Sequence, residues 1–250
     1  MTIAAASLTE VTEGVWIDPG PVSIVGMPLA TNITVLRLRD GLLLHSPIAL
    51  TPERRAAVEA LGPVTHLYAP NTFHHMWIGE WASAFPRARL SAPAGLAAKR
   101  PDLRIDRVHG VPDPDLDAVI HEVRIEGFRL EECALVYRPA GALVVADLVH
   151  NIGRPPHAWT RTYASAMGFY GKVALSRMLR WAAFADRRAA RRSVDALFEH
   201  DFDRLLVGHG APLDAGGKDA LRGAYEWLPP ATALARASTR GAVLRGAPCG

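Results

Sequence analysis

Hydrophobic and polar positions alternate along short segments of the first half of the chain. Residues 33–38 read Ile-Thr-Val-Leu-Arg-Leu, and this near-alternation predicts a half-buried β-strand. Arg39-Asp40-Gly41 predicts a turn, and the leucines at 42–44 begin a second strand, so the pair predicts a hairpin. An earlier strand is predicted at 14–18, with a turn at Pro19-Gly20-Pro21.

A helix with clear start and stop signals follows. Thr51 is a favourable N-cap, Pro52 suits the first helical position, and Gly62-Pro63 ends the segment. The apolar run at 64–68 then predicts a buried strand.

The second half repeats short strands around a long helical region. Strands are predicted at 121–125, 133–137, 142–146 and 204–207, and residues 163–199 are predicted to be mostly helical, with a break near Gly168 and Gly171. This order favours an α/β fold with mixed sheets and a helical insert around 155–200.

Composition narrows the class of protein. The chain has 250 residues, of which 49% are hydrophobic and 21% charged, which suits a single domain, expected over 1–237 with a loosely ordered tail at 238–250. A net charge of +3 is too small to indicate nucleic-acid binding.

Targeting and membrane signals are also weak in the sequence. No apolar stretch is long enough to predict a membrane span, and the first residues lack the pattern of a signal peptide. Cys133 and Cys249 have no metal-binding spacing. A cytoplasmic protein is therefore expected, and the sequence leaves open whether it forms homo-oligomers.

Candidate metal ligands follow the ends of three predicted strands. His74 and His75 come after the strand at 64–68, Asp147 follows 142–146, and His209 lies between two glycines after 204–207. Sites in layered α/β folds collect where strands end. Imidazole and carboxylate together suit zinc, iron or manganese. The other histidines at 109, 121, 157 and 200 have no partners at useful spacing and are predicted at the surface.

The segments Ala142-Leu-Val-Val-Ala-Asp147 and Leu205-Leu-Val-Gly-His-Gly210 resemble the metallo-β-lactamase superfamily. The resemblance extends over about 15–212 and includes Thr31-Asn32 and the segment 44–47. It implies an αββα sandwich, in which two mixed β-sheets are flanked by helices.

The chain departs from the main motif of that superfamily, His-x-His-x-Asp-His. Placed over 70–75, the motif puts Pro70 and Thr72 where the first two histidines belong, His74 in the aspartate place and His75 in the last histidine place. Phe128 takes the place of a further histidine. The resemblance thus implies that all three ligands of one metal are absent.

The ligands that the superfamily uses for its other metal fall on His74, His75, Asp147 and His209. The resemblance therefore implies one divalent ion, zinc first and iron as an alternative, with Asp147 and His209 as the residues expected to carry catalysis. It also implies hydrolysis of a small-molecule ester, thioester, amide or phosphoester. Catalysis needs an exchangeable coordination position.

Further residues near the expected ligands are candidates for holding them or the substrate. They are His45, Asn71, Trp77, His150 and Asn151. Two other functions stay open, namely a metal-free pseudoenzyme that binds a ligand or partner through a polar cluster, and a mononuclear iron oxidoreductase. The absence of the three ligands of the first metal favours the pseudoenzyme. The presence of all four ligands of the second metal favours a metalloenzyme.

Overall fold

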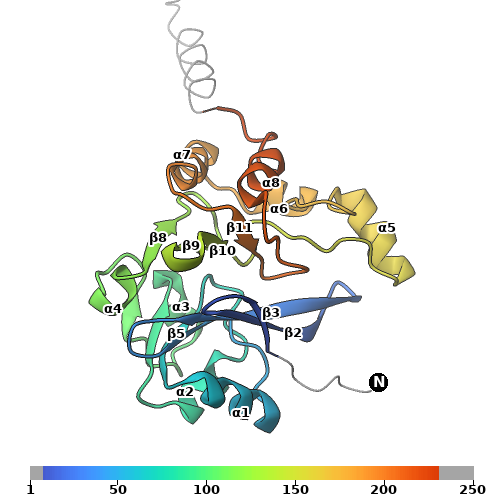
Figure 1. The fold of residues 1–250 in the computed structure, drawn as a ribbon. Coiled ribbons are helices and arrows are strands. Elements are labelled where there is room, and N and C mark those ends of the chain that lie inside the picture. The colour runs from blue at the N-terminus through green and yellow to red at the C-terminus, as the bar shows by residue number, and fades with distance from the viewer. Residues whose placement is uncertain (1–7, 231–250) are drawn as a thin grey trace, which may run out of the picture.

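Two β-sheets form the centre of the computed structural model, which describes residues 8–230 (Figure 1). The first sheet has seven strands in the order β1-β2-β3-β4-β5-β6-β7. These strands are β1 (Thr9–Thr12), β2 (Val15–Ile24), β3 (Met27–Arg37), β4 (Leu42–His45), β5 (Val64–Tyr68), β6 (Arg89–Ala92) and β7 (Arg107–Val108). The second has four strands in the order β11-β10-β9-β8, namely β8 (Ile120–Arg124), β9 (Cys133–Tyr137), β10 (Ala142–Val144) and β11 (Arg204–Leu206).

Helices cover the outer faces of both sheets and connect several strands (Figure 1). They are α1 (Pro52–Leu61), α2 (Ile78–Ala84), α3 (Ala94–Lys99), α4 (Pro114–Asp117), α5 (Ala158–Met167), α6 (Arg177–Ala182), α7 (Arg187–Leu197) and α8 (Gly217–Ala224), with a short 3₁₀ turn at Arg138–Ala140. The sheets combine parallel and antiparallel pairs, because β4-β5-β6-β7 and β10-β11 run parallel and the other pairs antiparallel. The predicted αββα sandwich is confirmed.

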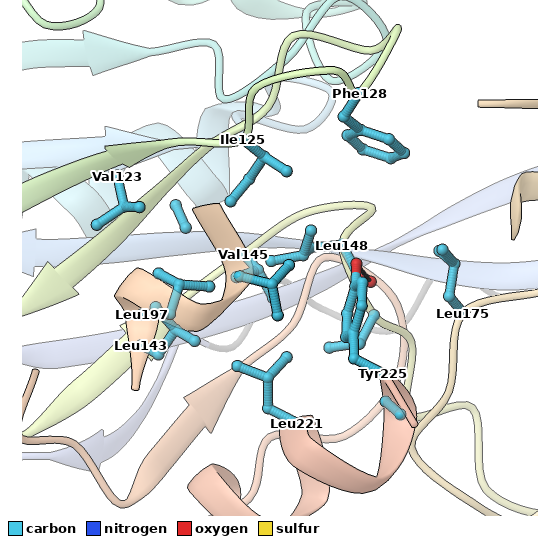
Figure 2. Packing of buried hydrophobic residues seen from close by; sticks show 14 of the residues in the cluster. Val123, Ile125, Phe128, Leu143, Val145, Leu148, Leu175, Leu197, Leu221 and Tyr225 are labelled. Atoms are coloured by element: carbon cyan, nitrogen blue, oxygen red, sulfur yellow. Dashed lines mark hydrogen bonds between the residues drawn. The ribbon is translucent and has the colours of Figure 1, made fainter. Parts of the chain in front are cut away.

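Alternating side chains of buried strands build the layers of the sandwich. Leu42 and Leu44 of β4 pack with the core under α1 and α2, whereas Leu43 between them faces the core between the two sheets. In β10, Leu143 belongs to the outer core beneath α7 and α8, and Figure 2 shows it with Leu197 and Leu221 from these helices. Strands that are apolar on both faces therefore require a helical layer on each outer side.

One predicted turn is wrong. Pro19-Gly20-Pro21 lies inside β2, which continues to Ile24 and pairs with β3 along its whole length. β1 pairs with β2 only up to Ile17, so beyond that point β2 is an edge strand. Prolines are tolerated at an edge, because their missing N–H groups leave no ladder hydrogen bond unmade. The chain turns instead at Val25 and Gly26, which both have positive φ.

Most other predicted elements are confirmed with small shifts of their ends. Thr51 caps α1 by accepting a hydrogen bond from the Arg54 backbone, and the hairpin of β3 and β4 forms as expected. The helical insert consists of α5, α6 and α7, and α5 ends at Gly168 in a left-handed conformation.

The predicted domain end at 237 and the predicted tail at 238–250 lie outside the described residues. Among the helices that are described, none combines the length and apolar character that crossing a bilayer requires.

Candidate metal centre

The loops that follow four strands meet at one edge of the sandwich. Ser46 follows β4, His74 follows β5, Asp147 follows β10 and His209 follows β11. β4 runs parallel to β5 and β10 runs parallel to β11, so within each pair the carboxyl ends lie side by side. The fold thereby brings together residues that are up to 163 positions apart, the separation of Ser46 and His209 (209 − 46).

Three side chains converge on a common centre. His74 Nε2 lies 3.2 Å from His209 Nε2 and 3.4 Å from Asp147 Oδ2, and His209 Nε2 lies 3.6 Å from Asp147 Oδ1. Each of the three offers one ligand atom, and these atoms all lie within 4.8 Å of one another. We call these residues, His74, Asp147 and His209, the central triad.

The donor atoms of the central triad have the spacing that a metal ion requires. Zinc bonds of about 2.0–2.1 Å in a tetrahedral arrangement put neighbouring ligand atoms about 3.3–3.4 Å apart. The two imidazole nitrogens lie 3.2 Å apart, and each lies 3.4 or 3.6 Å from a different oxygen of the Asp147 carboxylate, so the shortest distances between the three residues are close to that value. Two imidazoles and a carboxylate also suit zinc or ferrous iron. The residues therefore fit a single divalent ion.

The loop that carries His209 is held tightly in place. Asn32 of β3 donates its side-chain amide to the carbonyls of Val207 and Gly210, each at 2.8 Å. Gly210 has a φ of +97°, and a Cβ there would overlap the Asn151 carbonyl. His209 Nδ1 lies 2.9 Å from the Ala30 carbonyl oxygen. A carbonyl only accepts, so Nδ1 carries the hydrogen and the lone pair of Nε2 faces the centre.

Asn71 and Ser46 orient the other two members of the triad. The Asn71 amide nitrogen donates to Asp147 Oδ2 at 2.9 Å, and its oxygen accepts from the backbone N–H groups of Phe73 and His74, both at 2.8 Å. Ser46 Oγ lies 2.6 Å from His74 Nδ1. Each triad residue thus has a second partner that fixes its orientation, as ligands in metal sites do.

Glu132, a residue that the sequence analysis did not single out, holds the loop of Asp147. Its buried carboxylate accepts from the backbone N–H groups of Ala146, Asp147 and Leu148 at 2.8, 2.8 and 3.2 Å, and from the Asn71 amide at 3.0 Å. Burial, together with Asp147, raises the pKa of Glu132. The sequence carries only a faint signal for this role, an acidic residue directly before the apolar strand β9.

Electrostatics couple the members of the central triad. Burial alone would raise the pKa of Asp147, but His74 and His209 hold it well below its usual range. Burial alone would lower the pKa of His74, and the Asp147 carboxylate raises it above its usual value. Without a metal, the triad can therefore exist as a carboxylate paired with a protonated His74.

His75 does not join the central triad. Its ring points to the other side of the loop, where Nδ1 lies 3.2 Å from the Arg100 guanidinium. Burial and the cations of Lys99 and Arg100 lower the pKa of His75. Adjacent residues in this turn face opposite sides, so the structure brings together three of the four predicted ligands.

The other predicted neighbours divide into two groups. His150 and Trp77 line the cavity beside the triad, and the ring of His150 lies 5.4 Å from that of His209. Burial and His209 lower the pKa of His150 to about 4, and its Nδ1 has no hydrogen-bond partner among the described residues. Asn151 instead supports the His209 loop, through its backbone N–H to the His209 carbonyl at 3.0 Å and its side chain to the Ala211 carbonyl at 2.8 Å.

His45 lies behind the site in a buried aromatic stack. Its ring centroid is 5.8 Å from that of Tyr68, and on the opposite flank the rings of Tyr68 and His109 are 4.4 Å apart. The predicted surface position of His109 is wrong, because it is only 3% exposed. The short strand β7 at the edge of the sheet places His109, the next residue, over Tyr68. A strand of only two residues is too short to be recognised in the sequence, so the burial of His109 could not be predicted.

This stack predicts sensitivity to acid. Burial lowers the pKa values of His45 and His109 to about 3, so below the ordinary histidine pKa the unfolded chain takes up protons that the folded chain does not. Each of the two should lower the free energy of unfolding by about 1.4 kcal/mol per pH unit between about pH 6 and pH 4.

We expect His109→Phe to keep the stack and to remove one of these two contributions, because neither ring nitrogen of His109 has a partner among the described residues. Urea unfolding from pH 4.5 to 7 measures the slope, with His121→Phe at an exposed position as the control. An unchanged slope in His109→Phe would contradict the assignment.

Solved structures share the fold of this chain. DIM-1 metallo-β-lactamase exposed to ceftazidime is 10% identical, with a TM-score of 0.63, and the match covers 92% of this chain and 100% of that one. FIM-1 from Pseudomonas aeruginosa in a mono-zinc form is 14% identical, with 90% and 96% covered and a TM-score of 0.60. A metallo-β-lactamase from Erythrobacter litoralis is 16% identical, with 90% and 92% covered and a TM-score of 0.58. No protein-family model and no curated protein sequence matches the chain.

Proposed function

The chain has a divergent metallo-β-lactamase fold, and we propose that it is a hydrolase that uses one divalent metal ion, zinc by preference. The observation that carries the proposal is the central triad, whose three ligand atoms lie within 4.8 Å of one another while each residue is oriented by a further partner. Three protein ligands leave room for a solvent or substrate molecule, as in catalytic zinc sites.

The proposed ligand set is His74, Asp147 and His209, without His75. A zinc ion bound there would supply a Lewis acid and lower the pKa of water to near neutrality. A protein of the same fold is described in a mono-zinc form, which supports a site for one ion.

The residues around the triad would orient the metal ligands and contact the substrate. Asn71 and Ser46 keep the carboxylate and one imidazole oriented, so that little reorganisation is needed during the reaction. His150 is neutral near pH 7 and lines the cavity, where it can exchange a proton or a hydrogen bond with a bound substrate.

A second function is favoured by one specific observation. Two histidines and one carboxylate around open positions are also the ligand set of non-haem iron oxygenases. We put hydrolysis first, and the likeness of the fold to metallo-β-lactamases supports that order. A metal-free binding protein is the outcome if no ion binds.

Hydrolysis should depend on the metal. We expect protein stripped with a chelator to lose activity on a panel of ester, thioester, amide and phosphoester substrates, and one equivalent of zinc to restore it. Release of the chromogenic product measures the rate, and an oxygen electrode with ferrous protein tests the iron alternative. Activity that persists after complete removal of metal would contradict the proposal, and so would oxygen consumption with iron in place of hydrolysis.

A further inference from the structure

A cavity of ≈ 370 Å³ opens beside the central triad. At one end lie the triad, His150 and Ser46, and the other polar lining residues are Ser23, Thr31, Tyr163 and Ser176. The remaining walls are mostly apolar and come from Ile24 and Leu29 of the β2–β3 hairpin, Leu130, Ile152, Phe169 and Leu179. The cavity therefore presents reactive groups at one end and a hydrophobic compartment beyond them.

Cations are missing from this wall. Among the described residues that line the cavity, none is lysine or arginine, and Asp147 is the only acidic one. Lys99 lies near the rim, where its ammonium donates to the Thr72 carbonyl at 2.6 Å and sits 4.8 Å from the centre of the Phe73 ring. An anionic group held between the apolar walls, away from the triad, would lose its hydration without gaining a counter-charge there, which is costly.

Apolar side chains continue from the wall to the rim. Phe73, Met76 and Met178 line the cavity and are 56%, 60% and 45% exposed, respectively. Large apolar side chains gathered around an opening often mark a binding site. A hydrocarbon chain that starts at the triad would thus meet mostly apolar surface on its way to solvent.

Resting on the proposed hydrolase function, we propose that the substrate is an uncharged ester or lactone with an extended hydrocarbon chain. In its hydrolysis the oxygen of water forms a bond to the acyl carbon, the bond from that carbon to the alkoxy oxygen breaks, and the alkoxy oxygen leaves with a proton as the alcohol. An ester also gives a separate carboxylic acid, whereas a lactone opens to a single hydroxy acid, and in both cases the acid ionises near neutral pH.

Binding without a metal tests the ligand class alone. N-phenyl-1-naphthylamine, a neutral apolar fluorophore, would be bound to metal-free protein and displaced with 1-decanol or decanoate, which have chains of equal length. We expect decanoate to bind at least about tenfold more weakly than decanol, because its charge has no partner in the cavity. Equal affinities, or tighter binding of decanoate, would overturn the proposal.

A pair of variants on α6 gives the matched control. Met178→Lys puts a cation at the rim, at a position exposed enough to tolerate it, and should reduce the difference between decanol and decanoate. Trp181→Lys places the same charge on the same helix at a position that is 81% exposed and outside the cavity wall, and should leave the difference unchanged. Equal effects of both variants would show general electrostatic attraction and contradict the proposal.

Hydrolysis by zinc-loaded protein tests the proposed activity and the proposed substrate class together. We expect kcat/KM for 4-nitrophenyl esters to rise about threefold to fourfold per added methylene until the cavity is filled, and the hydrogen succinate ester to react far more slowly than the butyrate. Selective binding of decanol without hydrolysis would refute the proposed function and leave the ligand class standing. Hydrolysis that ignores chain length and charge would refute the ligand class alone.

Discussion

The Glu132→Gln variant is expected to lose about 3 kcal/mol of folding free energy, although glutamine has almost the same shape as glutamate. All four groups around the Glu132 carboxylate are donors, namely three backbone N–H groups and the Asn71 amide. A glutamine keeps one acceptor oxygen and turns an NH₂ group toward the remaining donors. Two buried donors then lose their partner, and each costs about 1–3 kcal/mol.

Thermal unfolding measures the effect of Glu132→Gln. A loss of this size lowers Tm by about 10 °C in a chain of this length. Glu131→Gln is the matched control, because Glu131 is the exposed neighbour and accepts from the Gly95 backbone at 2.9 Å. The control should change the stability by less than about 0.5 kcal/mol. If both variants have the same Tm as the unmodified chain, Glu132 does not hold the Asp147 loop.

The largest expected effect on function comes from His209→Ala. This change removes one of three donors and the only triad ring whose hydrogen position is fixed by a backbone carbonyl. Changes to the partners of metal ligands cost 10–100-fold in affinity, so we expect the loss of a ligand itself to exceed about 100-fold. Competition with a chelating dye measures the zinc affinity.

His75→Ala is the informative comparison for His209→Ala. His75 is equally buried, at 7% exposure against 5%, but its ring faces Arg100 instead of the triad. Its removal should leave the zinc affinity close to that of the unmodified chain. Equal losses in the two variants would return His75 to the ligand set and contradict the geometry described above.

Much of the fold could be predicted because the sequence signals are local. The capped helix after Thr51, the hairpin at 39–41 and the apolar strand at 64–68 follow from turn chemistry and from side-chain alternation. The turn expected at Pro19-Gly20-Pro21 was wrong, because no local signal shows that this part of β2 has a free edge.

The candidate site was predictable only in part. His74, Asp147 and His209 could be predicted because each follows the end of an apolar strand, and strands of this kind are visible in the sequence. The choice between His74 and His75 depends on which side of one turn each ring faces, and a sequence does not contain that information. Glu132, Ser46 and Asn32 support the triad through contacts that span between 14 and 178 positions, so no motif connects them to it.

Native mass spectrometry of the chain titrated with zinc tests the central claim most directly, because it counts ions on each molecule. The account predicts one zinc ion per chain in the unmodified protein and in His75→Ala, and none at the same zinc concentration in His209→Ala. Two ions per chain, or one ion that persists in His209→Ala, would contradict a single site at His74, Asp147 and His209. No bound zinc in any of the proteins would contradict the metalloenzyme itself.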